Sequence, residues 1–125
     1  MTEPPNPDSQ RRSAVVLKIC DSIDWRRAIA AGRYHGSADD ARDGFIHLSA
    51  PHQLAGTLNR HFAGRDGLLL VAFATDTLGE ALRWEVSRGG DLFPHHYGPL
   101  DPGRALWVRD IALGQDGRHT LPELQ

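Results

Sequence analysis

Apolar residues fall in short runs along this chain, and most of the runs have the two-residue period of a β-strand. Residues 14–19 are aliphatic and β-branched, which predicts a strand, and residues 68–74 are continuously apolar. A run of the second kind is typical of a central strand that is covered on both faces. Residues 45–49 and 82–86 alternate apolar with polar side chains, which predicts strands with one polar face, and residues 104–113 predict a final strand.

Two helices are predicted between these strands. The first follows residues 14–19 and ends at Gly32, and its inward face is expected to carry Trp25, Ala28 and Ile29. The second begins near Pro51, has Ser49 or Ala50 as its cap and ends at Gly64, with an inward face of Leu54, Leu58 and Phe62.

The remaining segments divide the chain into a tail, one domain and a short extension. Residues 1–13 contain three prolines and no apolar stretch, so we expect them to be disordered. Polar residues and turn formers predict loops over 33–43 and 87–102. About five strands and two helices between 14 and 113 make a single α+β domain, and 114–125 form a C-terminal extension.

Composition excludes some classes of protein without indicating an activity. The chain has 125 residues, a net charge of −2 and one cysteine. These values give no reason to expect a nucleic-acid partner, a disulfide or a cysteine-rich zinc site. No apolar run approaches the roughly 18 residues of a membrane span, and no secretory signal is present, so we expect a cytoplasmic protein without a membrane association.

The polar faces of two predicted strands carry candidate chemistry. His47 and Ser49 lie opposite the apolar positions of 45–49, and Glu85 lies opposite Leu82, Trp84 and Val86, which we expect to be buried. An imidazole, a hydroxyl and a carboxylate that share one cavity form a general acid–base site or a polar ligand cleft. The alternatives are local: Ser49 caps a helix, His47 is a structural histidine and Glu85 pairs with an arginine.

The segment from Phe93 to Leu100 (FPHHYGPL) is the second candidate, since it places His95, His96 and Tyr97 between prolines. Stiff loops of this composition often line sites, and the alternative is that their aromatic residues close the edge of the core. The histidine spacing matches no established zinc motif, so we expect no metal.

Several of these residues resemble the bacterial family called Domain of Unknown Function 952. The resemblance rests on Trp25, Gly32, Gln53 and the runs Gly44–Ser49 (GFIHLS), Arg83–Glu85 (RWE) and Phe93–Leu100, and it extends over about 14–113. The family is similar in fold to the ADP-ribosyltransferases. That similarity implies a split, curved, mostly antiparallel sheet that holds NAD or a related nucleotide in a cleft.

The resemblance also implies roles for individual residues. It implies that Lys18 stands where many family members have a histidine, that His47 or Ser49 occupies the second active-site position, and that Glu85 supplies the carboxylate beside the ribose. A lysine there weakens the case for NAD, and because it could reach a phosphate instead, a nucleotide or another phosphate-bearing ligand stays open. The expected catalytic residues are therefore Glu85, His47 and Ser49, and the expected ligand-binding residues are Lys18, Arg83, His95 and Tyr97.

Three functions remain open at this point. The chain is an enzyme that acts on NAD or a related nucleotide, a binding module for a nucleotide or phosphorylated metabolite that has no turnover, or a protein-interaction domain that uses the 93–100 segment. The first two require a small-molecule ligand, and the mechanism requires that His47 and Glu85 share a wall of one cavity.

Overall fold

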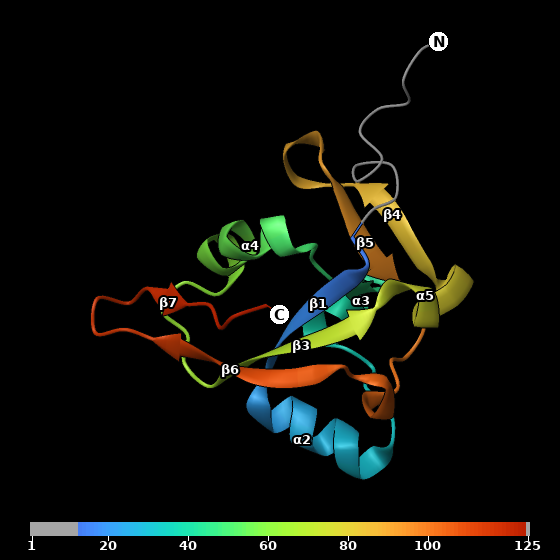
Figure 1. Cartoon of the computed structure of the whole chain (residues 1–125), viewed down its shortest axis with the longest axis horizontal. Coiled ribbons are helices and arrows are strands. Elements are labelled where there is room, and N and C mark those ends of the chain that lie inside the picture. The colour runs from blue at the N-terminus through green and yellow to red at the C-terminus, as the bar shows by residue number, and fades with distance from the viewer. Residues whose placement is uncertain (1–12, 125) are drawn as a thin grey trace.

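The computed structural model describes residues 13–124, so the predicted disordered segment 1–13 lies outside the described residues except for Ser13. Within 13–124, one antiparallel sheet has four strands in the order β1-β3-β6-β7 (Figure 1). Its strands are β1 (Val15–Asp21), β3 (Leu68–Ala74), β6 (Trp107–Leu113) and β7 (His119–Thr120). The predicted strands over 14–19, 68–74 and 104–113 are confirmed, the last with a later start.

A second antiparallel sheet has three strands in the order β2-β5-β4. Its strands are β2 (Ile46–His47), β5 (Leu92–His96) and β4 (Leu82–Val86). The two sheets meet where Leu17 of β1 and Ser49 exchange two backbone hydrogen bonds of 2.8 Å. The described chain is therefore an α+β domain whose antiparallel strands are split between two sheets.

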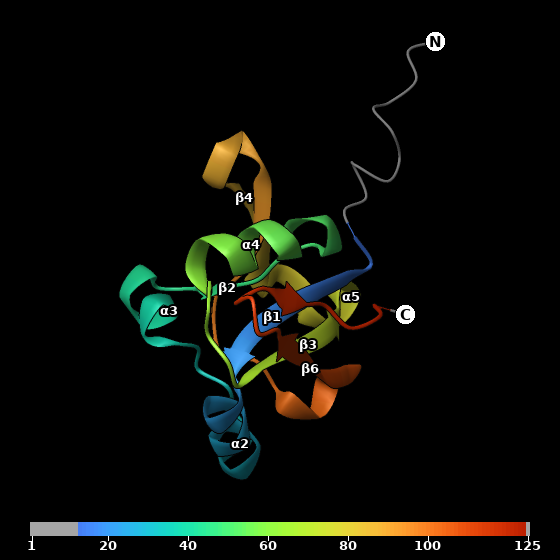
Figure 2. The same cartoon turned by 90° about the vertical axis from the view of Figure 1, so that its left-hand side faces the viewer.

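Helices cover both faces of the four-stranded sheet. Helix α2 (Ser22–Ala31) and helix α4 (Leu54–His61) lie on opposite sides of β1 and β3 in both views (Figures 1 and 2). Alternate residues of β3 therefore enter two separate apolar clusters, with Val71 and Phe73 facing α2 and Leu68, Leu70 and Ala72 facing α4. This arrangement confirms the expectation of a central strand covered on both faces. No helix within the described residues has the length and apolarity needed to cross a bilayer.

Helix α2 begins and ends where the sequence predicts. The Asp21 carboxylate accepts hydrogen bonds from the backbone of Ile23 and Asp24, and Gly32 ends the helix with a φ of 80°. Trp25 and Ala28 are buried, but Ile29 is 58% exposed, so its predicted inward position is wrong. The sheet contacts only a narrow stripe of this short helix, and Ile29 lies one residue, about 100°, beyond it.

The second predicted helix is divided into two parts. Residues Pro51–Gln53 form a 3₁₀ turn (η1), and α4 follows and ends before Phe62 rather than at Gly64. Ala50, not Ser49, occupies the cap position, and its backbone N–H donates to the Gln53 side chain at 2.9 Å. The hydroxyl of Ser49 is thereby left for a contact elsewhere.

Two predicted loops contain regular structure. Helix α3 (Ala38–Asp43) interrupts 33–43, and β5 in the segment 87–102 is the central strand of the second sheet. The sequence of α3 lacks an apolar face, and the proline and histidines of β5 are poor strand formers, so propensity missed both elements. The alternation over 82–86 is confirmed for a partly buried Trp84 but is wrong for Val86, which is 70% exposed near the hairpin end.

Short helical turns complete the described chain. Helix α5 (Thr75–Leu78) and η2 (Gly79–Ala81) connect the two sheets, η3 (Arg88–Gly90) joins β4 to β5, and η4 (Pro102–Arg104) precedes β6.

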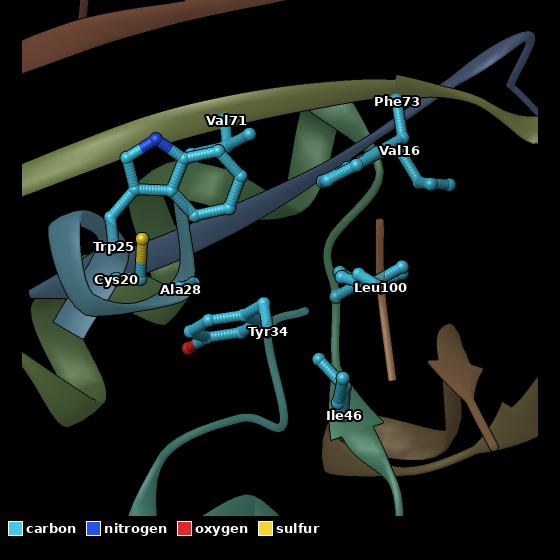
Figure 3. Close-up of a cluster of buried hydrophobic side chains, with 10 residues drawn as sticks. Val16, Cys20, Trp25, Ala28, Tyr34, Ile46, Val71, Phe73 and Leu100 are labelled. Atoms are coloured by element: carbon cyan, nitrogen blue, oxygen red, sulfur yellow. The ribbon is translucent and has the colours of Figure 1, made fainter. Parts of the chain in front are cut away.

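Tyr34 lies inside the cluster that α2 covers, beside Trp25 and near Leu100 (Figure 3). Its ring centroid is 5.9 Å from that of Trp25, and its hydroxyl oxygen is buried without a hydrogen-bond partner among residues 13–124. Burial raises the pKa of this phenol, so the hydroxyl stays protonated and loses its hydration without compensation.

We therefore expect Tyr34→Phe to raise the free energy of unfolding by about 1 kcal/mol, because the substitution removes a buried polar atom and keeps the ring. Urea denaturation measures the change. Tyr97→Phe is the matched control: it removes a hydroxyl that donates to Glu85 at 2.7 Å, and stability is expected not to rise. A loss of stability in Tyr34→Phe would show that this hydroxyl has a partner.

Candidate functional site

A cavity of about 300 Å³ lies between α3, α4 and the three-stranded sheet. Four of the seven sequence-predicted site residues line it, namely Lys18, His47, Ser49 and His95. Glu85, Arg83 and Tyr97 do not line it. Additional lining comes from residues that the sequence analysis did not select, among them Asp40, Thr57, His61 and Arg88.

A buried carboxylate, Asp40 of α3, holds one wall of the cavity together. Its Oδ2 accepts from Lys18 Nζ at 2.8 Å, and its Oδ1 lies 2.6 Å from Nδ1 of His47 and accepts from the His47 backbone at 3.1 Å. Asp40 is 3% exposed and Lys18 is 5% exposed. Ser37 caps α3 and exchanges hydrogen bonds with Asp40, which fixes the carboxylate at the start of the helix.

The pKa of Asp40 follows from this environment. Burial alone disfavours the carboxylate, but the hydrogen bond with His47 and the charge and hydrogen bond of Lys18 outweigh burial and hold the pKa well below its usual range. Lys18 also donates to the carbonyl oxygen of His47 at 3.0 Å. The ammonium is therefore enclosed in a structural ion pair, and this geometry argues against the expectation that Lys18 reaches a ligand phosphate.

His47 has carboxylates at both ring nitrogens. Its Nδ1 faces Asp40, and its Nε2 lies 3.0 Å from Oδ2 of Asp43 at the end of α3. The side chain is 38% exposed and forms part of the cavity wall. Each ring nitrogen already has a carboxylate neighbour, so His47 is a fixed part of the cavity wall and has no further ring nitrogen to offer a ligand.

A second carboxylate–histidine pair forms on the three-stranded sheet. His95 of β5 is 5% exposed, its Nδ1 lies 2.8 Å from Oε1 of Glu85, and its ring stacks on Phe45 at 4.0 Å between centroids. The same Oε1 accepts from the Tyr97 hydroxyl at 2.7 Å. The hydrogen bond from Tyr97 lowers the pKa of Glu85 most, and the hydrogen bond with His95 lowers it further.

His47 and Glu85 were expected to share a cavity wall, but only His47 lines the cavity. Strand β5, which carries His95, lies between β2 with His47 and β4 with Glu85. The ring centroids of His47 and His95 are 5.7 Å apart, and Glu85 reaches the cavity only through His95. Arg83 lies over the Tyr97 ring at 4.8 Å, outside the cavity lining. In place of the expected site of Glu85, His47 and Ser49, the structure has two carboxylate–histidine pairs. These are Asp40–His47 and Glu85–His95, and their histidine rings are neighbours.

Ser49 takes part through its neighbour on α4. The Ser49 and Thr57 hydroxyl oxygens are 3.2 Å apart, and Thr57 and His61 line the cavity one helical turn apart. A signal for Asp40 was present in the sequence as Ser37-x-x-Asp40, the spacing of a capping box. Thr57, His61 and Arg88 carry no such local signal, since only the packing of α4 against the β4–β5 hairpin places them at the cavity.

The described residues contain no group of three or more histidine, cysteine or acidic side chains arranged to hold a metal ion. The polar groups that line the cavity include imidazoles, carboxylates, hydroxyls and the guanidinium groups of Arg42 and Arg88.

Comparison with known proteins supports the resemblance noted in the sequence. A family model described as "Protein of unknown function (DUF952)" matches residues 19–108. The chain belongs to this family. No protein with a curated description matches the chain.

Three solved structures of one other protein are similar to this fold. The crystal structure of protein CC0527 from Caulobacter crescentus is 43% identical, has a TM-score of 0.82, and its match covers 85% of this chain and 93% of that one. A double-mutant crystal structure of CC0527 is 42% identical, with the same TM-score and coverage. Its solution NMR structure is 43% identical, has a TM-score of 0.76, and covers 85% of this chain and 91% of that one.

The buried pair predicts a specific response to Asp40→Asn. We expect a loss of about 3 kcal/mol or more in the free energy of unfolding, because the substitution leaves the Lys18 ammonium buried without its counter-ion. Adding Lys18→Met to that variant should restore part of the loss, since the uncompensated charge is then absent. Denaturant melts of the two single variants and the double variant measure the coupling. Additive losses would contradict it.

The same carboxylate predicts an acid limit to stability. Because folding lowers the pKa of Asp40, its contribution is complete above the ordinary aspartate value of 3.8 and is lost as the pH falls below that value. Urea melts between pH 3 and pH 7 should show this decline in the wild type. The Lys18→Met/Asp40→Asn variant should show a smaller decline over the same range, and an equal decline would assign the acid limit to other carboxylates.

Proposed function

We propose that this chain is a small enzyme that acts on a nucleotide, with NAD as the first candidate, and that His95 is its general acid–base. The Glu85–His95 pair carries the proposal. Glu85 faces Nδ1 of His95 at 2.8 Å, Phe45 stacks on the ring, and the other ring nitrogen has no hydrogen-bond partner among residues 13–124. A carboxylate on Nδ1 selects the tautomer whose Nε2 can accept a proton.

The proposed chemistry is cleavage of the bond between nicotinamide and ribose. His95 takes a proton from the attacking water, whose oxygen bonds to the ribose carbon, and the electron pair of the broken carbon–nitrogen bond leaves with neutral nicotinamide. The imidazolium then releases its proton to solvent. Glu85 stabilises the imidazolium, so it acts through His95 as a positioning residue instead of contacting the ribose as the family resemblance implied.

The other residues of the cavity have supporting roles in this proposal. His47, whose ring nitrogens both lie beside carboxylates, forms part of the wall against which the ligand packs, and Ser49 contributes a hydroxyl through its contact with Thr57. A volume of about 300 Å³ is at the small end of ligand pockets. It accommodates one half of a dinucleotide, and the other half would extend out of the cavity.

The division of the strands between two sheets supports the relation to the ADP-ribosyltransferases. Such a fold is expected to hold its ligand in the cleft of a split sheet, and the cavity of this chain includes Ser49, which joins the two sheets. This relation remains part of the proposal.

One observation favours the alternative of a binding module without turnover. Lys18 stands at the first active-site position of the resemblance, and its ammonium is occupied by Asp40 and the His47 carbonyl. A cavity that has lost this contact could still bind a nucleotide. That alternative predicts ligand-induced thermal stabilisation with no product.

The enzyme proposal predicts nicotinamide release from NAD that depends on His95. We expect His95→Gln to lower kcat about 100-fold, the usual size of a general-base effect, without unfolding the protein. His35→Gln, which changes an exposed histidine outside the cavity, is the matched control and should keep full activity. Chromatography of nicotinamide and a parallel thermal melt measure both properties.

Glu85→Gln separates a positioning role from a structural one. It should lower kcat less than His95→Gln and move the acid limb of the pH–rate profile to lower pH, because the imidazolium loses its anionic partner. Absence of turnover of NAD and of every nucleotide by the wild type, together with thermal stabilisation by one of them, would overturn catalysis in favour of the binding module.

A further inference from the structure

Arg88 is a cavity-lining arginine that no carboxylate neutralises. It is half-buried, and no ion pair joins it to an acidic side chain in residues 13–124. Its guanidinium lies over the Phe93 ring at 5.0 Å. Arg42 lines the same cavity but contacts the carboxylates of Asp39 and Asp43 at 3.0 and 3.2 Å. Of these two arginines, Arg88 is the one whose charge is available to an anion.

The backbone that carries Arg88 is anchored. Arg88 begins the turn between β4 and β5, in which Ser87 donates to the carbonyl of Asp91 at 2.9 Å. Gln53, which is 4% exposed, donates from Nε2 to the Asp91 carboxylate at 2.8 Å and to the Leu92 carbonyl at 2.7 Å. The turn is therefore tied to η1, and little ordering remains to be done when a ligand binds.

Helix α4 approaches the guanidinium closely because residue 56 is glycine. A Cβ atom at Gly56 would lie 3.1 Å from Nη2 of Arg88. The next residue, Thr57, and His61 one turn later line the same cavity. A guanidinium, a hydroxyl and an imidazole thus share one part of the wall, with the hydroxyl of Ser49 3.2 Å from that of Thr57.

We propose that Arg88, Thr57 and His61 form a phosphate-binding subsite of this cavity. The three side chains offer donors of three kinds, which suits the three oxygens of a phosphate monoester better than the two of a carboxylate. Lys18 cannot serve this purpose, because Asp40 holds its ammonium. Where the proposed function also holds, the subsite defines the substrate as a phosphorylated molecule whose phosphate lies on Arg88 and whose reacting carbon lies toward His95.

The test is a titration of the full chain with inorganic phosphate, AMP and adenosine at constant ionic strength, followed by NMR of the backbone amides. The wild type should bind phosphate saturably and AMP at least tenfold more tightly than adenosine. Arg88→Gln should weaken phosphate binding about tenfold or more, the range of a lost charge-assisted hydrogen bond, and should abolish the preference for AMP over adenosine.

Two further variants separate position from charge and from folding. Gly56→Ala keeps every charge and favours the helix, so the melting temperature should hold or rise while the displaced guanidinium weakens phosphate binding several-fold. Arg42→Gln removes one positive charge from the same cavity and should change phosphate affinity less than twofold. An equal loss in Arg42→Gln and Arg88→Gln would overturn the subsite in favour of general electrostatic attraction.

Failure of this subsite and failure of catalysis give different results. Phosphate binding that needs Arg88, without any turnover, supports the subsite and overturns only the enzyme. Turnover that needs His95, with phosphate binding unaffected by Arg88→Gln, overturns only the subsite. No saturable phosphate binding by the wild type also overturns the subsite, and citrate binding more tightly than phosphate overturns its assignment to phosphate.

Discussion

The fold around the cavity depends on one buried ion pair, between Lys18 in the middle of β1 and Asp40 at the start of α3. A charge placed in a sheet interior is unfavourable unless its partner and hydrogen bonds accompany it. Asp40 satisfies Lys18, caps its own helix with Ser37 and contacts both the backbone and the ring of His47. A single carboxylate therefore connects β1, α3 and β2, which together form one wall of the cavity.

The two histidines have different partners and are therefore suited to different tasks. His47 is enclosed by acidic residues of α3, whereas His95 has one carboxylate and one unoccupied nitrogen within the described part of the chain. β5 brings them together by pairing with β2 on one side and β4 on the other. An arrangement that needs three strands and a helix is a property of the tertiary structure, with no sequence motif of its own.

The elements that the sequence predicted correctly are those marked by a strong local signal, such as an apolar run or a glycine that ends a helix. The run 68–74 and the stop at Gly32 were unambiguous, because a continuous apolar strand and a left-handed glycine have few alternative interpretations. The central strand β5 was missed because Pro94 argues against a strand, yet its carbonyl accepts a hydrogen bond from Leu48 at 3.0 Å. Local propensity could not show that this proline has partners on both sides.

For the site, four of the seven residues that the sequence suggested line one cavity, the other three lie outside its lining, and several partners differ from those expected. Glu85 was expected beside a ligand and instead holds His95, and Lys18 was expected to contact a phosphate and instead pairs with Asp40. Both errors concern long side chains that reach residues 10 or more positions away. The face of a strand can be predicted from alternation, whereas the neighbour at the end of a side chain depends on helices whose placement the sequence left open.

The β4–β5 turn, which Gln53 attaches to η1, forms a wall of the cavity that is separate from the wall built on α3. One wall is built on α3 and β2 and holds an imidazole between acids, while the facing wall is the end of a hairpin whose turn is held by the Gln53 amide and by the His52 ring, 3.2 Å from Asp91. Substitutions in that turn can alter its length and charge without disturbing the ion pair beneath β1. The turn that carries Arg88 and the buried pair that supports the opposite wall thus lie in separate stretches of the chain, which allows selection to change the first while the second stays constant.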